Sequence, residues 1–253
     1  MSAERDQILR EMGFGPIWKL RHVAAAAPAP DVASVFVAES PLQPELSLAA
    51  LPLPAVAAEF PAAVPANMSW EELAAAVLAC RRCGLCEARK QAVLGVGDVH
   101  ADWLFVGEGP GAEEDQRGEP FVGQAGKLLD SMLAAIGLQR GRNVYIANAV
   151  KCRPPENRTP APDETATCRP YLERQIELIR PKLIVALGRP AAQTLLQTEI
   201  KIASARGRLH DYRGIPLIVT YHPAYLLRTL LDKAKAWEDL CFMRRVMKAQ
   251  KTD

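Results

Sequence analysis

The sequence predicts an α/β protein in which a mostly parallel sheet of four strands lies between two layers of helices, a three-layer α/β/α arrangement. Short apolar runs alternate with longer segments of helical periodicity, and this alternation is typical of parallel sheets covered on both faces. Four such runs have the length of strands, at residues 102–106, 144–147, 182–187 and 215–220. The 253 residues suffice for one sizeable domain and an additional segment.

The additional segment precedes the domain. Residues 1–22 contain scattered apolar side chains that fit a short helix, which we interpret as a docking segment for a protein partner. Residues 23–68 consist mostly of Ala, Pro, Val, Leu and Glu, and prolines this frequent break helices and strands alike, so we expect a disordered linker. The alternative is a tether with no fixed fold. The folded domain is predicted to span residues 69–253.

The helices of the folded domain are predicted from caps and apolar faces. The first begins at Ser69, because Ser69 and Glu72 form a capping-box pattern. Pro181 ends the third helix, and Pro190 begins the fourth. Residues 208–212 precede the last strand and form with it a hairpin or a simple turn. The predicted helices are residues 69–79, 123–136, 163–180, 190–196 and 232–248.

The bulk charge and the cysteine count restrict the class of protein. The formal net charge is only +2, so any surface that binds nucleic acid must be a local basic patch. No apolar run is long enough to cross a bilayer and the N-terminus lacks a secretory pattern, so we expect a cytoplasmic monomer without a membrane partner. Six cysteines in such a chain indicate metal ligands or reactive thiols rather than disulfides.

Polar residues follow three of the predicted strands. In a parallel sheet, ligands bind beyond the carboxyl ends of the strands, so Glu108, Asn148 and His222 are expected in one crevice. The amide of Asn148 offers a donor and an acceptor in one plane and fits the edge of a base; the alternative is a turn or cap residue. A lone histidine such as His222 is more often structural than catalytic.

Two apolar features accompany these residues. Phe121 follows a glycine-rich loop and belongs either to the core or to a stacking platform. The loop lacks a phosphate-binding pattern and is followed by acidic residues, which disfavours a nucleotide-phosphate site. Leu226 and Leu227 lie between His222 and Arg228, and we interpret them as an exposed wedge that enters a base stack, with Arg228 on a phosphate.

Four cysteines are arranged as expected for a metal centre. Cys80 and Cys83 form a C-x-x-C pair, Cys152 lies in a proline-rich loop, and Cys168 lies on a predicted helix. Zinc sites usually show two close pairs, so this spread favours an iron–sulfur cluster. The spacing alone leaves Cys86 as a rival of Cys80.

Six motifs in order make the chain resemble the family-4 uracil-DNA glycosylases, over about residues 75–245. They are Cys80-Arg-Arg-Cys83-Gly-Leu85, Val106-Gly-Glu-Gly-Pro-Gly111 with Glu113-Glu-Asp115, Pro120-Phe-Val-Gly-Gln-Ala-Gly126, Val144-Tyr-Ile-Ala-Asn148, Val150-Lys-Cys-Arg-Pro-Pro155 with Asn157-Arg158, and His222-Pro-Ala-Tyr-Leu-Leu-Arg228. The resemblance implies a uracil-DNA glycosylase-like fold and a [4Fe-4S] cluster on Cys80, Cys83, Cys152 and Cys168. It also implies DNA contacts by Arg153, Arg158 and Arg228.

The activity that this resemblance implies is removal of uracil from single- or double-stranded DNA by hydrolysis of the N-glycosidic bond. His222 and Asn148 are then catalytic, Gly109 and Phe121 bind the base, and Glu108 and Glu114 are unranked candidates for positioning water or stabilising charge. In the wider superfamily an aspartate activates water where this chain has Gly109. The alternatives are a non-catalytic iron–sulfur module that binds DNA or a polymerase, and an enzyme for another base.

Overall fold

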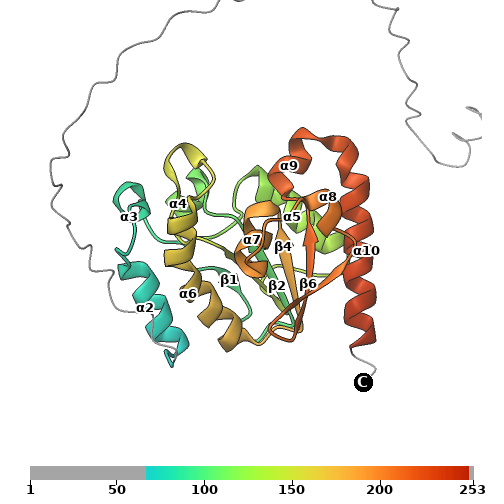
Figure 1. Cartoon of the computed structure of the whole chain (residues 1–253), viewed down its shortest axis with the longest axis horizontal. Helices are drawn as coiled ribbons and strands as arrows, with labels where there is room; N and C mark the ends of the chain where they lie inside the picture. Colours follow the sequence, from blue (N-terminus) through green and yellow to red (C-terminus); the bar gives the residue numbers. More distant parts are fainter. Residues whose placement is uncertain (1–66, 251–253) are drawn as a thin grey trace, which may run out of the picture. The chain divides into compact units, whose positions relative to one another are not determined.

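The computed structural model describes residues 67–250 of the chain (Figure 1). The docking helix predicted at residues 1–22 lies outside this range, as does the predicted linker except for residues 67 and 68. Both therefore stay predictions. No helix within residues 67–250 has the length and apolar composition that a membrane span requires.

A single sheet forms the centre of the domain, in the order β1-β3-β2-β4-β6-β5. The four predicted strands are parallel neighbours: β2 (Trp103–Gly107), β3 (Val144–Asn148), β4 (Leu183–Leu187) and β6 (Ile215–Thr220). Two antiparallel strands, β1 (Val96–Gly97) and β5 (Leu209–Tyr212), lie at the edges. The predicted fold class is confirmed, but the sheet has six strands rather than four.

The two strands beyond the predicted four, β1 and β5, differ in whether the sequence indicates them. β1 has only two residues, too few for any apolar pattern to mark it as a strand. β5 joins β6 through Arg213 and Gly214, both at positive φ, so the hairpin reading of this segment is correct. Because the four central strands are parallel to one another, their carboxyl ends lie at one edge of the sheet, and the two antiparallel strands do not change this.

Helices cover both faces of the sheet, as the alternating pattern predicts. Alternate strand residues face two separate apolar clusters. One cluster joins the sheet to α5 (Gln124–Ala135), α9 (Pro223–Arg228) and α10 (Lys233–Ala249). The other joins it to α6 (Pro162–Ile179), α7 (Arg189–Leu196) and α8 (Ile202–Ala205).

A third apolar cluster holds the first helix outside these layers. α2 (Trp70–Ala79) packs beside α6, as Figure 1 shows, and contributes Leu73 and Val77 to the cluster. Its predicted capping box is present, since the Ser69 hydroxyl accepts a hydrogen bond from the Glu72 amide and the Glu72 carboxylate accepts one from the Ser69 amide. The remaining short helices are α3 (Leu85–Ala88), α4 (Ala112–Arg117), η1 (Pro155–Asn157) and η2 (Leu230–Asp232).

Candidate active site and metal centre

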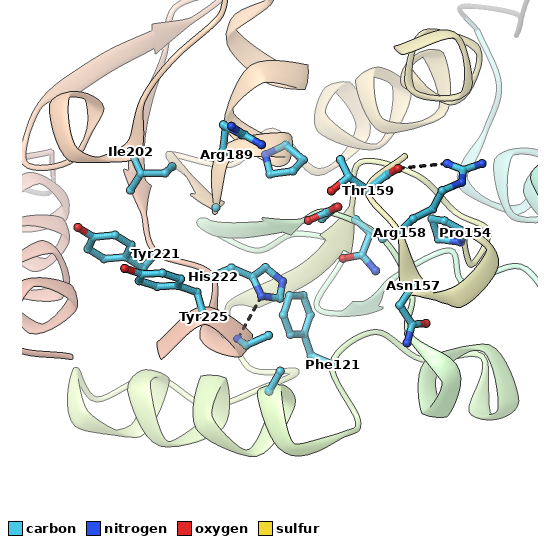
Figure 2. A pocket seen from close by; sticks show the side chains of 18 of the residues that line it. Phe121, Pro154, Asn157, Arg158, Thr159, Arg189, Ile202, Tyr221, His222 and Tyr225 are labelled. Atoms are coloured by element: carbon cyan, nitrogen blue, oxygen red, sulfur yellow. Dashed lines mark hydrogen bonds between the residues drawn. The ribbon is translucent and has the colours of Figure 1, made fainter. Parts of the chain in front are cut away.

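A pocket of about 930 Å³ lies at the carboxyl ends of the central strands (Figure 2). Glu108 follows β2, Asn148 ends β3 and His222 follows β6, and all three line this pocket. The sheet thus brings together three residues that are far apart in the sequence, as expected for the carboxyl ends of parallel strands. Phe121, Gly109, Glu114, Arg158 and Arg228 also line the pocket.

His222 is held as a neutral imidazole with one defined tautomer. It caps α9, and its Nδ1 accepts a hydrogen bond of 3.1 Å from the amide of Ala224. Nδ1 therefore carries no proton, and the proton of the neutral ring is on Nε2. Burial, reinforced by the charge of Arg228, lowers the pKa of His222 to about 4. At neutral pH the ring is an uncharged hydrogen-bond donor.

Phe121 belongs both to the core and to the pocket. Its side chain is only 6% exposed, yet its ring lies 5.4 Å from the ring of His222, and Figure 2 shows the two side by side. The backbone of Phe121 has a φ of 56°, which is uncommon for a residue with a side chain. Arg140 holds this conformation by donating to the carbonyls of Pro120 and Phe121. A place in the core is therefore compatible with a role of Phe121 as a stacking platform.

The amide of Asn148 is buried at the base of the pocket with unused hydrogen-bonding capacity. The side chain is 2% exposed, and its Oδ1 has no hydrogen-bond partner among residues 67–250. Buried polar atoms are almost always paired, so an unpaired one in a pocket points to a ligand donor. Gly107 makes this packing possible, because a Cβ there would lie 2.4 Å from Oδ1 and 2.6 Å from Cζ of Phe121.

The two candidate carboxylates have different environments. Glu114 accepts hydrogen bonds from three amides, those of Gly111 (3.1 Å), Val122 (3.0 Å) and Gly123 (3.2 Å). It therefore joins the glycine-rich loop to the Phe121 loop. Glu108 also lines the pocket, and burial raises its pKa against the opposing effects of the Thr159 hydroxyl and Arg189.

The predicted wedge is wrong for Leu226. That side chain is 1% exposed and packs into the core beneath the sheet, whereas Leu227 is 41% exposed. The cause is local structure: this segment is the helix α9, so adjacent side chains point in different directions. Leu230 and Leu231, in the η2 helix that follows, are 63% and 89% exposed.

The predicted DNA-contacting arginines differ in how firmly they are held. Arg158 makes a two-point ion pair with Glu164, at 2.8 and 2.7 Å. Arg153 donates to Asn157 within the same loop, and Arg228 is exposed at the pocket edge. Sequence reasoning did not identify Arg189, although it follows β4 at the same edge and also lines the pocket.

The four predicted cysteine ligands lie in one apolar cluster. Cys152 and Cys168 are buried members of the cluster that includes Leu73 and Val77, and Cys80 and Cys83 pack against it. Two of the sulfurs accept hydrogen bonds, Cys152 from Arg89 (2.7 Å) and Cys168 from the amide of Lys151 (3.3 Å). The rival Cys86 is not part of this cluster.

The protonation of these thiols depends on their burial. Desolvation raises the pKa of Cys152 to about 11 and that of Cys168 to about 12, so without a cation both are thiols. Within residues 67–250, no three His, Cys, Asp or Glu side chains are grouped so as to hold one metal ion. A four-iron cluster has a different requirement, because each iron takes one cysteine and the ligands surround a volume.

Comparison with known proteins defines the class first and then the family. A sequence profile described as the uracil DNA glycosylase superfamily matches residues 94–241, more than half of the chain, so the chain belongs to that superfamily. A type-4 uracil-DNA glycosylase of Archaeoglobus fulgidus is 46% identical over 167 residues, which are 63% of this chain and 83% of that protein. One of Thermotoga maritima is 47% identical over 151 residues, 59% of this chain and 78% of that protein. Within the superfamily, the chain is a member of the type-4 uracil-DNA glycosylases.

A more distant match bears on the alternative that the chain is a non-catalytic module associated with a polymerase. A DNA polymerase of Bacillus phage SP01 is 32% identical over 144 residues, which are 57% of this chain but only 16% of the polymerase. The similarity to the type-4 enzymes is higher and covers most of their length. Family membership therefore rests on the type-4 relatives.

Proposed function

We propose that this chain removes uracil from DNA by hydrolysing the N-glycosidic bond of deoxyuridine, with His222, Asn148 and Phe121 as the residues that act on the base. The observation that carries the proposal is that one pocket holds both a neutral histidine, whose Nε2 is a donor, and a buried amide oxygen with no hydrogen-bond partner among residues 67–250. Uracil offers complementary groups, a carbonyl and an N–H, on its edges. The base leaves the stack before it can enter, at a cost of a few kcal/mol.

Asn148 accounts for the choice of base. Its Oδ1 would accept from N3–H of uracil while its Nδ2 donates to O4. Cytosine has an unprotonated N3 and an amino group at position 4, so both partners would be mismatched and left unpaired. Phe121 would stack on the extruded ring, which contributes roughly 1–3 kcal/mol in comparable sites.

His222 would act on the leaving group. Uracil departs as an anion, and negative charge grows on O2 as the glycosidic bond breaks. A donor already oriented toward that oxygen stabilises the transition state more than the ground state, and one such donor typically changes the rate by about 10²–10³. The neutral ring suits this role, because it donates without transferring its proton.

Glu108 is the carboxylate we propose for positioning the water or stabilising the sugar cation. Both carboxylates line the pocket, but the oxygens of Glu114 already accept hydrogen bonds from three amides. Glu114 is therefore proposed as a positioning residue that fixes the Phe121 loop. Gly109 would let the base approach the backbone of the glycine-rich loop.

The DNA-binding surface would surround the pocket mouth. Arg153, Arg158 and Arg228 are proposed to contact phosphates, and of the two predicted wedge residues only the exposed Leu227 is retained. Both single- and double-stranded DNA remain proposed substrates, and the monomeric state, the cytoplasmic location and the partner of the N-terminal segment remain predictions.

The metal centre is proposed to be a [4Fe-4S] cluster held by Cys80, Cys83, Cys152 and Cys168. The fit rests on four thiols around one apolar cluster and on N–H donors at two sulfurs, a feature that tunes such clusters. When bound, the cluster supplies covalent cross-links between α2, the 151–158 loop and α6. This would hold the arginine-bearing loop beside the pocket.

The proposed cluster is tested by measuring the iron content of the purified protein and of matched cysteine variants. Protein purified without oxygen should be yellow-brown and contain about four irons. Cys168→Ala should lose iron and solubility, because ligand loss uncouples cluster binding from folding. Cys86→Ala and Cys241→Ala, which remove cysteines outside the apolar cluster, should keep the colour. Stoichiometric zinc without iron would exclude the assignment.

The activity is tested with an oligonucleotide that carries a single labelled deoxyuridine. Release of free uracil, followed by alkaline cleavage at the abasic site, is the expected result. A non-catalytic module would bind the same oligonucleotide without releasing uracil. Parallel substrates with hypoxanthine or a mismatched thymine separate the enzyme for uracil from one for another base.

A further inference from the structure

The residue that precedes Cys152 is a fully buried lysine with no assigned task. Lys151 is 1% exposed, between the end of β3 and the cysteine loop. Its Nζ donates to the main-chain carbonyl of Asn148 (2.8 Å) and to Oε1 of Gln175. Gln175 is itself buried and is fixed by donating to the carbonyl of Leu94 (2.9 Å). The ammonium is therefore held in a rigid polar network.

Neither acceptor of this ammonium carries a charge. The backbone of Lys151 joins it to two of the proposed metal ligands, because Cys152 is the next residue and the Cys168 sulfur accepts a hydrogen bond of 3.3 Å from the Lys151 amide. A buried cation without an anionic neighbour is strongly unfavourable. As thiols, the two cysteines would provide no compensation. As metal ligands they are thiolates, and a four-thiolate iron–sulfur cluster is anionic overall.

We infer that Lys151 is a positioning residue that couples the metal centre to the base reader: its ammonium balances the negative charge of the cluster and holds the backbone of Asn148 in place. The inference rests on the proposed cluster and goes beyond its role as a cross-link. The main-chain contact lies directly at the residue whose side chain faces the pocket. The same lysine also joins the centre through its amide, which donates to the Cys168 sulfur at 3.3 Å.

The test uses Lys151→Met, which keeps the length of the side chain but removes the charge and the donor. Lys182→Met is the matched control, because it removes a positive charge from a half-exposed lysine at the start of β4. Both variants are compared with iron-loaded wild-type protein. The first measurement is the reduction potential of the cluster by film voltammetry. The second is the affinity for DNA that carries a non-cleavable deoxyuridine analogue.

Loss of a positive charge beside the cluster should shift the potential of Lys151→Met to more negative values. Loss of the hydrogen bond that fixes the Asn148 backbone should weaken binding of the uracil analogue about tenfold, with little change for undamaged DNA. A merely structural lysine would change the melting temperature without changing the potential. The Lys182→Met control should match the wild type in potential and in affinity.

A second variant covers the case in which Lys151→Met does not fold. Gln175→Glu places a carboxylate beside the same ammonium and should also shift the potential to more negative values, while uracil affinity is retained. Wild-type potentials in the soluble variants would refute the inference and leave the proposed function standing. Wild-type protein that lacks iron, or that releases no uracil, would instead refute the proposed metal centre or activity.

Discussion

Replacement of His222 by asparagine should abolish most of the catalysis while leaving the local structure intact. The imidazole has two tasks, since Nδ1 caps α9 through the Ala224 amide and Nε2 is left to donate into the pocket. Asparagine is also a good N-cap residue, and its Oδ1 can accept from Ala224. Its side chain is shorter, so it does not replace the Nε2 donor. His222→Asn therefore separates the structural role from the chemical one.

The expected magnitude follows from the loss of one preorganised donor. Single-turnover cleavage should fall by about 10²–10³, which corresponds to roughly 2.7–4 kcal/mol of transition-state stabilisation. Affinity for uncleaved uracil DNA should change little, because the donor matters most once charge has developed on O2. His222→Ala should show the same rate loss and also lose the cap, worth about 1 kcal/mol or roughly 2–4 °C in melting temperature.

The pH dependence of stability gives an independent check that His222 is neutral in the folded protein. Its pKa is lowered to about 4 from an unperturbed value of 6.5, so the unfolded chain binds the proton more readily than the folded one. Stability from this group is present above pH 6.5 and is lost as pH falls toward 4. Between pH 7 and pH 5 the wild type should lose at most about 2 kcal/mol more unfolding free energy than His222→Asn.

Two results would refute this reasoning. A His222→Asn variant with the wild-type single-turnover rate would remove the donor role. Parallel stability curves for the two proteins between pH 7 and pH 5 would show that the imidazole is not held neutral by its surroundings.

Three further predictions concern recognition of the base and of DNA. Asn148→Asp should impair uracil release strongly, because a carboxylate lacks the donor for O4; unchanged release with an intact cluster would contradict the base-reading role. Leu227→Ala should slow cleavage in duplex DNA more than in single strands, whereas Leu78→Ala, on a leucine 58% exposed on α2, should affect neither; equal losses on both substrates would exclude a wedge. Arg228→Ala should reduce the salt dependence of DNA binding by about one unit of slope. Arg158→Ala should reduce it less, because an ion pair already holds that guanidinium.

The arrangement of the site was predictable because apolar runs in the sequence indicate where each strand ends. Apolar runs that end at Glu108, Asn148 and His222 are local signals, and the rule for parallel sheets then places their ends together. The cysteine set followed from the family resemblance rather than from spacing, and the apolar cluster leaves out Cys86 as the resemblance implies.

Features that depend on contacts between distant segments were not predictable in the same way. Leu226 was assigned to the wedge because α9 has only six residues, too few to display a helical period, so its inward direction was not apparent. Glu108 and Glu114 are equivalent acidic residues in the sequence. Both line the pocket, and only the folded chain brings the amides of Val122 and Gly123 onto Glu114.

In the glycine-rich loop, Gly109 closely approaches a neighbouring side chain, and the adjacent Glu108 lines the pocket. A Cβ at Gly109 would lie 2.8 Å from Cγ2 of Val150, a fully buried side chain two residues after the end of β3. The loop therefore has little room for the aspartate that the wider superfamily resemblance would place here. The adjacent Glu108 has the longer side chain and reaches the pocket, where burial raises its pKa and Thr159 and Arg189 favour the charged form. Holding a water or facing a developing sugar cation would each require the ionised form, which Thr159 and Arg189 favour and which burial, the larger effect, disfavours.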